Sequence, residues 1–276
     1  MVLFKFRSLF LFAAIGVCCV LSCSKGGDEE VVKPIIDPSM SRITKIIAHR
    51  GFWRVEGACE NSLAAAESAV KLGVDGIELD VWITIDDSII VSHDASVGGK
   101  EIIASSFADL KDETLMNGER IPTIRDFLRL MKQYPKIELF IEVKANRAVN
   151  RLVEIIKEEQ IINPVIFLSF NKVACDRLIS LDRSFHVEPL RQWEDVVSAV
   201  DLVNRGYSGL AYSSEYYHVH SGIIDDASRI DMTLSSWLVN TPEEYDWFFG
   251  KGFKYVISDN PAELVDKTTY SLDYWY

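Results

Sequence analysis

The sequence has few cysteines, few histidines and no excess of positive charge. Only five cysteines occur in 276 residues, and Cys18, Cys19 and Cys23 lie in the N-terminal segment. The two others, Cys59 and Cys175, are too far apart in the sequence to indicate a disulfide framework or a zinc site. With 29 basic against 41 acidic side chains, the net charge of −12 argues against nucleic acid as a partner and against a polybasic membrane patch.

Long apolar runs are also missing beyond the N-terminus, so we expect no membrane-spanning helix in the rest of the chain. Residues 1–22 differ, because a short positive region precedes an apolar stretch, as in an export signal. The letters VLSC at 20–23 resemble a bacterial lipobox, in which Cys23 becomes the lipidated first residue. The expectation is a lipoprotein of the cell envelope, on the periplasmic side of a membrane or at the outer-membrane surface. The alternative is a plain cleaved signal in which Cys23 is incidental.

Removal of residues 1–22 would take away two basic and no acidic side chains. The mature chain would then carry 27 basic and 41 acidic side chains, a net charge of −14. Residues 23–41 are polar and contain two prolines, which predicts a flexible tether. Residues 42–276 are predicted to form one domain, whose only link to a membrane is the N-terminal anchor.

Beyond the tether, short apolar runs alternate with helical patterns. Strands are predicted at 43–49, 76–84, 88–92, 138–144, 165–170, 185–190, 207–212, 231–239 and 254–258. Helices are predicted at 61–73, 123–133, 148–160, 171–181, 193–204 and 242–251. Several strands are rich in Ile and Val on both faces, as parallel strands covered by helices are. The order and the length predict an α/β fold, a single TIM-type (β/α)₈ barrel with an insertion after the second strand, within 88–134.

Two predicted strands carry charged side chains at a spacing of two. Side chains two apart on a strand face the same way, so Glu78 and Asp80 project together. Glu142 and Lys144 share a face in the same manner. Three carboxylates at strand ends suit one hard divalent ion, Ca²⁺ or Mg²⁺, and the ammonium of Lys144 suits a phosphate oxygen. The alternatives are an exposed strand edge for Glu78 and Asp80, and a buried ion pair for Glu142 and Lys144.

Two of the five histidines stand where a predicted strand gives way to its loop. His49 ends the first strand, and His93 follows the run at 88–92. In a barrel this face carries catalysis, and a histidine pair can divide the work of general base and general acid. Arg50 offers a planar fork for phosphate oxygens. A lone histidine at a strand end is more often structural, but a pair beside an arginine favours a site.

These segments together resemble the glycerophosphodiester phosphodiesterase family. The resemblance covers 45–261 in seven motifs, which begin at His49-Arg50-Gly51, Glu60-Asn61-Ser62, Glu78-Leu79-Asp80, His93-Asp94, Glu142-Val143-Lys144, Ser235-Ser236-Trp237 and Ser258-Asp259-Asn260. It implies that His49 and His93 are the acid–base pair and that Glu78, Asp80 and Glu142 bind the metal. It also implies that Arg50 and Lys144 contact phosphate, that Trp237 lines the pocket, and that Glu60 and Asn61 lie beside the site. For Asn61, the N-cap of the following helix is an equal alternative.

Three features depart from the family pattern, and two further histidines match no motif of it. Ser62 and Ser258 stand where Thr is commoner, and the loop at 95–99 lacks a longer Thr- and Arg-bearing stretch, which affects the substrate more than the activity. His218 and His220 match no catalytic motif; they could line the alcohol pocket or lie in an exposed loop.

The resemblance implies that glycerophosphodiesters are hydrolysed to an alcohol and sn-glycerol 3-phosphate. The substrate's own 2-hydroxyl would attack phosphorus, and a cyclic intermediate would then be opened by water. His49 is the favoured base, although the sequence does not order the two histidines. The alternatives are a phospholipase C- or D-like enzyme acting on lipids or lysolipids, and a non-catalytic binding lipoprotein of the cell surface.

Overall fold

The computed structural model describes residues 44–191 and 198–269. The predicted export signal, the tether and the lipidated Cys23 lie outside these residues, and so does the start of the helix predicted at 193–204. Within the described ranges, no helix is both long and apolar enough to cross a membrane.

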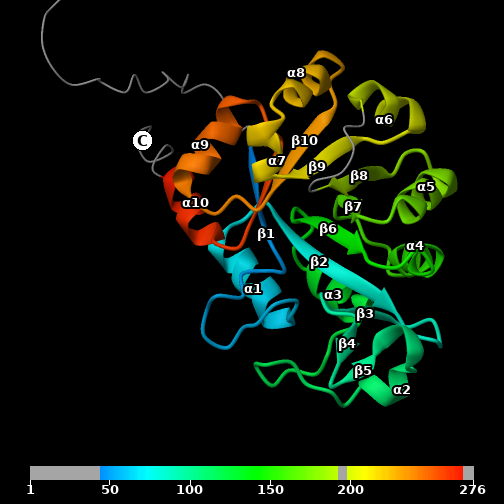
Figure 1. Ribbon diagram of the computed structural model, residues 1–276. Helices are drawn as coiled ribbons and strands as arrows, with labels where there is room; N and C mark the ends of the chain where they lie inside the picture. The colour runs from blue at the N-terminus through cyan, green and yellow to red at the C-terminus, as the bar shows by residue number, and fades with distance from the viewer. Residues whose placement is uncertain (1–43, 192–197, 270–276) are drawn as a thin grey trace, which may run out of the picture. The chain divides into compact units, whose positions relative to one another are not determined.

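Eight parallel strands form a closed ring. Strand β1 pairs with both β2 and β11, which closes the sheet, and the order around the ring is β1-β2-β6-β7-β8-β9-β10-β11. The predicted TIM-type barrel is therefore confirmed (Figure 1). The strands are β1 Lys45–Ala48, β2 Gly76–Ile83, β6 Glu138–Val143, β7 Val165–Ser169, β8 His186–Arg191, β9 Gly209–Ser213, β10 Thr233–Trp237 and β11 Tyr255–Ser258.

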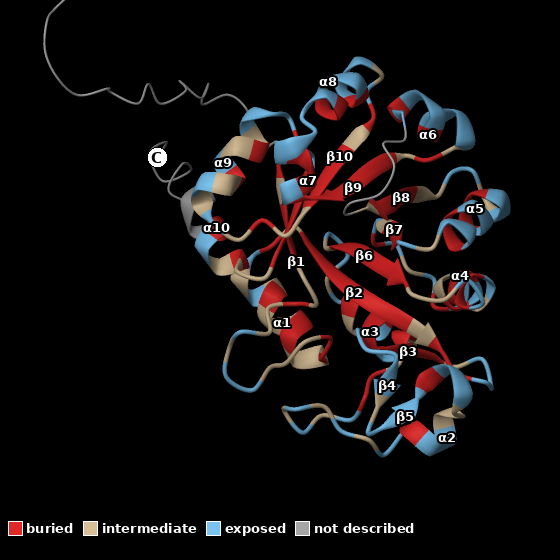
Figure 2. Cartoon of the chain, in the orientation of Figure 1, coloured by how far each residue is buried: buried red, intermediate tan, exposed pale blue. Residues whose placement is uncertain are grey.

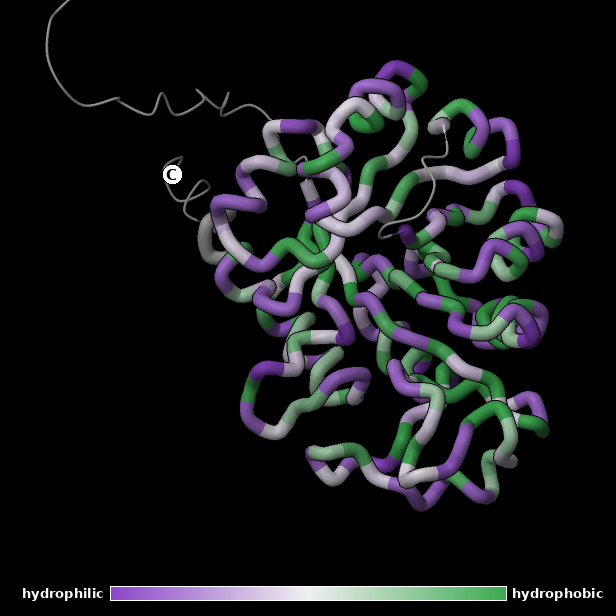
Figure 3. Tube along the Cα trace, viewed as in Figure 1, coloured by the Kyte–Doolittle hydropathy of each residue, from purple (hydrophilic) through white to green (hydrophobic). Residues whose placement is uncertain are grey.

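Helices follow the strands and pack on the outside of the ring. They are α1 Leu63–Leu72, α4 Ala148–Glu158, α5 Lys172–Leu181, α6 Ala199–Arg205, α7 Ser214–Val219, α8 Gly222–Arg229, α9 Pro242–Gly250 and α10 Pro261–Thr269. Each of these helices is buried on the side that faces the strands and exposed on the other (Figure 2). The strands carry long hydrophobic stretches (Figure 3), as expected where both faces of a parallel sheet are covered.

The predicted insertion after the second barrel strand is present between β2 and β6. It contains β3 Ile89–Val91, which lies antiparallel to β2, and then β4 Ser96–Val97, β5 Lys100–Glu101, a 3₁₀ turn Ile102–Ala104 and α2 Phe107–Leu110. The helix α3 Ile124–Met131 returns the chain to the barrel. The insertion has a small core of its own, made by Ile90, Ile102, Leu110 and Ile121.

The insertion also holds the first barrel helix by its N-terminus. Glu119 accepts hydrogen bonds from the backbone N–H groups of Leu63 (3.1 Å) and Ala64 (3.3 Å). These groups have no partner within the helix, so a carboxylate placed there satisfies them and also favours the helix dipole. The loop that precedes α1 is thereby fixed between the barrel and the insertion.

Candidate active site

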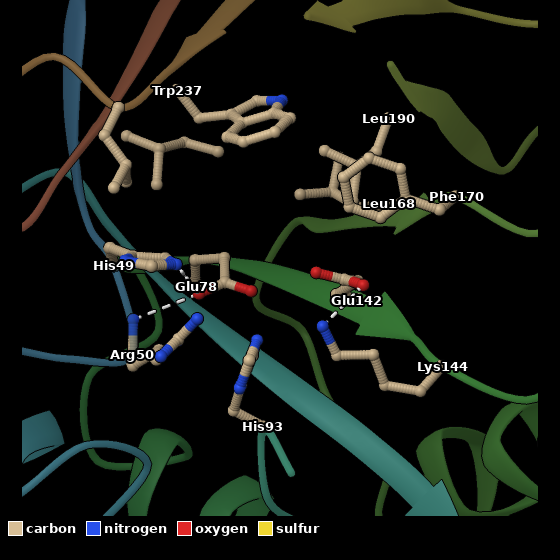
Figure 4. A pocket seen from close by; sticks show the side chains of 12 residues that line it. His49, Arg50, Glu78, His93, Glu142, Lys144, Leu168, Phe170, Leu190 and Trp237 are labelled. Carbon is tan, nitrogen blue, oxygen red and sulfur yellow. Dashed lines mark hydrogen bonds and ion pairs between the residues drawn. The ribbon is translucent and has the colours of Figure 1, made fainter. Parts of the chain in front are cut away.

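A pocket lies at the carboxyl ends of the barrel strands, where barrel sites are found. Its lining contains seven of the residues singled out in the sequence, six titratable ones and Trp237, together with five apolar side chains (Figure 4). The charged residues are His49, Arg50, Glu78, His93, Glu142 and Lys144, and the apolar ones are Leu168, Phe170, Leu190, Leu238 and Ile257.

The three carboxylates of β2 and β6 form one compact group. Asp80 and Glu142 are partners in the β2–β6 register, and Glu78 is two residues from Asp80 on the same face of β2. One oxygen of each lies within 4.8 Å of the others, and all three residues are buried, with exposed fractions of 3% for Glu78, 1% for Asp80 and 8% for Glu142. The predicted grouping is therefore real, and the reading of Glu78 and Asp80 as an exposed strand edge is wrong.

Burial and mutual repulsion dominate the electrostatics of this group. Burial, together with the nearby Asp80 and Glu142, holds the pKa of Glu78 well above its usual value. Burial likewise raises the pKa of Glu142 to about 7, although Lys144 opposes the shift. Burial also acts to raise the pKa of Asp80, but Lys144, Asn61 and Arg50 outweigh it, and the pKa falls below its usual value.

Asn61 and Arg50 hold Asp80 from one side. The amide of Asn61 donates to Oδ2 of Asp80 (2.9 Å), and its oxygen accepts from the Asp80 backbone N–H (3.2 Å). Nε of Arg50 lies 3.4 Å from the same Oδ2, while Nη1 donates to Glu60 (2.5 Å). The N-cap of α1 is Ser62, which accepts from Ala65, so the N-cap alternative for Asn61 is wrong. Asn61 instead supports the site.

The residues present fit a bound divalent cation. Oδ1 of Asp80 is buried and receives no hydrogen bond from any described residue, although Nζ of Lys144 lies 2.8 Å away. A buried carboxylate oxygen needs a positive charge beside it, and the ammonium of Lys144 supplies that charge here. Three carboxylates that each offer an oxygen form the all-oxygen ligand set that Ca²⁺ and Mg²⁺ prefer.

The two histidines differ in their surroundings. Nδ1 of His49 lies 2.7 Å from Oδ1 of Asp259, which follows β11, and its Nε2 lies 3.8 Å from Glu78. Both side chains are largely buried, with 17% exposed for His49 and 14% for Asp259. His93 is 42% exposed, and its Nδ1 contacts the still more exposed Asp94 at 3.0 Å. His49 is therefore held rigidly, while His93 stands at the mouth of the pocket.

The apolar half of the pocket was not predicted, apart from Trp237. Phe170 packs edge-on against Trp237, with ring centroids 5.6 Å apart, and the indole N–H donates to the carbonyl of Ala211 (2.9 Å). Leu168, Leu190 and Ile257 read in the sequence as ordinary core residues of buried strands, and nothing in their type distinguishes a pocket wall from a core. Asp259 belongs to the Ser258-Asp259-Asn260 motif, but the sequence alone predicts no function for its side chain.

His218 and His220 do not belong to the pocket lining. His218 lies on α7, in which Tyr216 and Tyr217 are buried, and His220 directly follows the helix; both histidines are exposed. The ring of His218 packs on Trp247 (4.3 Å), and that of His220 packs on Tyr216 (4.5 Å). The pocket-wall alternative is therefore wrong. The alternative of an exposed position is confirmed, although His218 lies on a helix rather than in a loop.

Comparison with known proteins gives a consistent result. The model of the Glycerophosphoryl diester phosphodiesterase family matches residues 49–263. A glycerophosphodiester phosphodiesterase of Caldanaerobacter subterraneus is 28% identical over 245 residues, which cover 81% of this chain and 97% of that protein. Lysophospholipase D GDPD1 of Mus musculus is 23% identical, over 81% of this chain and 86% of that protein.

Solved structures agree with the sequence matches. A glycerophosphodiester phosphodiesterase from Parabacteroides distasonis superposes with a TM-score of 0.78 and 31% identity, over 84% of this chain and 98% of that one. A phosphodiesterase from Oleispira antarctica, solved with the product sn-glycerol-3-phosphate, has a TM-score of 0.74 and 21% identity, over 84% and 97%.

The clamp of Asn61 on Asp80 generates a prediction about stability. Asn61 has a left-handed backbone (φ 60°), so Asn61→Gly keeps the conformation and removes only the side chain. Because two buried groups of Asp80 lose their partner, we expect the free energy of unfolding to fall by about 1–3 kcal/mol. Urea denaturation of the metal-free protein measures this change.

Asp87→Gly is the matched control, because Asp87 is also left-handed (φ 61°) but exposed. It should change the free energy of unfolding by no more than about 0.5 kcal/mol. Equal effects of the two substitutions would show that the amide of Asn61 does not support Asp80.

Proposed function

The chain belongs to the glycerophosphoryl diester phosphodiesterase family, a family of phosphoric diester hydrolases. On that premise we propose that it hydrolyses glycerophosphodiesters to sn-glycerol 3-phosphate and an alcohol. The proposed reaction uses one divalent cation and a pair of histidines. The observation that carries the proposal is that Glu78, Glu142, both histidines, Arg50 and Lys144 line one pocket, with Asp80 buried beside the two glutamates. Burying so many charges together is costly to the fold, which favours a site that uses them.

The anionic centre of the substrate would lie on the charged side of the pocket. Arg50 and Lys144 would contact the phosphate oxygens, with the fork of Arg50 held in place by Glu60 and Asp80. Glu78, Asp80 and Glu142 would hold one Ca²⁺ or Mg²⁺, which when bound supplies positive charge beside the phosphate. Neutralising the diester makes phosphorus accessible to a nucleophile.

His49 is the proposed general base for the glycerol 2-hydroxyl. A carboxylate at Nδ1 favours the tautomer with its proton on that nitrogen, which leaves the lone pair on Nε2, and it stabilises the ring after protonation. Asp259 lies at hydrogen-bonding distance from Nδ1, and Nε2 is on the side of Glu78. Attack of the substrate's own hydroxyl would give a cyclic glycerol phosphate, which water would open in a second step.

His93 is the proposed general acid for the departing alcohol. Its exposed position at the mouth of the pocket suits a group that leaves toward solvent. The apolar wall around Trp237 and Phe170 would receive carbon-rich parts of that alcohol. The wall could instead contact the acyl chain that a lysophospholipid carries on its glycerol, so a lysophospholipid is a second candidate substrate. Turnover of the two substrates can be compared directly.

Metal removal tests the function as a whole. We expect the purified protein to release sn-glycerol 3-phosphate from glycerophosphocholine, or lysophosphatidic acid from lysophosphatidylcholine, with choline as the leaving alcohol in both cases. It should lose at least about 99% of this turnover after exhaustive chelation. Asp80→Asn and Glu142→Gln should abolish turnover and weaken Ca²⁺ or Mg²⁺ binding, with circular dichroism unchanged. Full activity of the chelated protein would contradict the proposed metal dependence.

If the two histidines act as base and acid, their alanine variants should respond differently to a change of leaving group. His49→Ala and His93→Ala should each slow hydrolysis of glycerophosphocholine by roughly 10²–10⁴-fold, the usual contribution of a positioned proton donor or acceptor. An activated aryl alcohol leaves without needing a proton, so such a substrate should rescue His93→Ala and not His49→Ala. If neither variant slowed the choline substrate by even about tenfold, both histidines would be structural.

The localisation proposal rests on the VLSC letters at 20–23, and it concerns residues outside the described ranges. We expect the full chain, expressed in a bacterium, to fractionate with membranes, and Cys23→Ser to abolish this association or block processing. Ser24→Ala is the control and should behave like the wild type. Identical soluble behaviour of Cys23→Ser and wild type would contradict lipidation at Cys23.

A further inference from the structure

The ammonium group of Lys144 lies among the carboxylates that are proposed to hold the cation. Its Nζ is 2.8 Å from Oδ1 of Asp80 and 2.6 Å from Oε1 of Glu142, and the side chain is only 13% exposed. Among the described residues, Arg50 is the other Lys or Arg side chain within ion-pair distance of the three carboxylates. In Figure 4, Lys144 points back from β6 toward Glu142.

Oδ1 of Asp80, the oxygen beside Lys144, is also the oxygen of this carboxylate that is available to bind a cation. Oδ2 of Asp80 already accepts a hydrogen bond from Asn61 and lies beside Nε of Arg50, whereas Oδ1 receives no directed hydrogen bond from a described residue. A Ca²⁺ ion binds oxygens at about 2.3–2.6 Å and Mg²⁺ at about 2.0–2.1 Å. A cation at such distances from Oδ1 of Asp80 and from Glu142 would occupy nearly the place of the ammonium.

We infer that Lys144 is an exchangeable counter-ion, which neutralises the carboxylates of the metal-free protein and is displaced when the divalent cation binds. This inference rests on the metal dependence proposed above. The flexible four-carbon stem of lysine allows the movement, whereas the rigid fork of arginine would restrict it. Because Lys144 lines the same pocket as Arg50 and His49, the displaced ammonium stays within reach of a phosphate in that pocket.

In this exchange, the divalent cation competes with the ammonium group of Lys144 for the same carboxylates. Removal of the Lys144 charge should therefore tighten cation binding, although it removes a proposed phosphate contact and so lowers turnover. A lysine that contacts phosphate alone, away from the cation, would lower turnover without this gain in cation affinity. The two effects have opposite signs, which separates the exchange from a role in substrate binding alone.

The test measures Ca²⁺ and Mg²⁺ binding to chelator-stripped protein by calorimetry, without substrate. Lys144→Met should lower the dissociation constant by roughly tenfold or more, because a like charge next to the cation is removed. Lys45→Met is the matched control: Lys45 begins β1, at the opposite end from His49, and pairs with Glu138. It removes the same net charge and should leave the dissociation constant unchanged within about twofold.

Thermal unfolding gives a second readout. Metal-free Lys144→Met should melt at a lower temperature than the metal-free wild type, and saturating Ca²⁺ should close most of this gap. Should the metal-free Met variant fail to fold, Lys144→Gln gives the same calorimetric comparison, because it keeps a hydrogen-bond donor without the charge.

Three outcomes would overturn the inference. Unchanged or weaker cation binding by the Lys144 variants would exclude the exchange while leaving the proposed function intact. Equal tightening by Lys45→Met would assign the effect to net charge. Absence of cation binding by the wild type would overturn both the exchange and the proposed metal dependence.

Discussion

The site depends on one constraint: the carboxylates of Glu78, Asp80 and Glu142 are buried close to one another. The β2–β6 register sets Asp80 beside Glu142, and the alternation of β2 adds Glu78 to the same face. The strands cannot slip to relieve the repulsion, since each is hydrogen-bonded on both sides in a closed ring. The repulsion must therefore be offset locally, and Arg50 and Lys144 are the positive side chains beside it. Burial, together with the neighbouring carboxylates, still raises the pKa values of Glu78 and Glu142.

The segment from Arg50 to Ser62 has the conformation needed to deliver these compensating groups. Arg50 and Asn61 both have left-handed backbones, and the N–H of Asn61 donates to the carbonyl of Arg50. Gly51 approaches α1 so closely that a Cβ would lie 2.8 Å from Ala65. Glu119 of the insertion then fixes the N-terminus of α1. The insertion thus braces the segment that carries Arg50, and it also brings His93, at the end of β3, to the same pocket.

The sequence predicts those parts of the site that follow from local periodicity. The alternation of side chains along β2 and β6 predicts which carboxylates share a face. The position of His49 and His93 directly after strands predicts that both lie at the site. Contacts between distant segments are not predictable in this way: Asp259 and His49 are 210 positions apart. The alternative that placed His218 and His220 in the pocket wall was wrong because Tyr216 and Tyr217 are the residues of this segment that are buried. Their rings bury against the barrel and favour a helix capped by Ser213, which leaves both histidines outside.

The order of strands around the ring also decides how a substrate would lie. The charged residues come from three adjacent strands, β1, β2 and β6, and from the insertion attached to β2, whereas β7, β8, β10 and β11 supply the apolar wall. His49 lies where the charged residues meet the apolar wall, because β1 pairs with β11. The backbone N–H of His49 donates to the carbonyl of Ser258 in β11 (2.9 Å). That pairing also brings Asp259 to the imidazole. The proposed base therefore acquires its partner only when the last strand meets the first, so the site is complete only in the closed barrel.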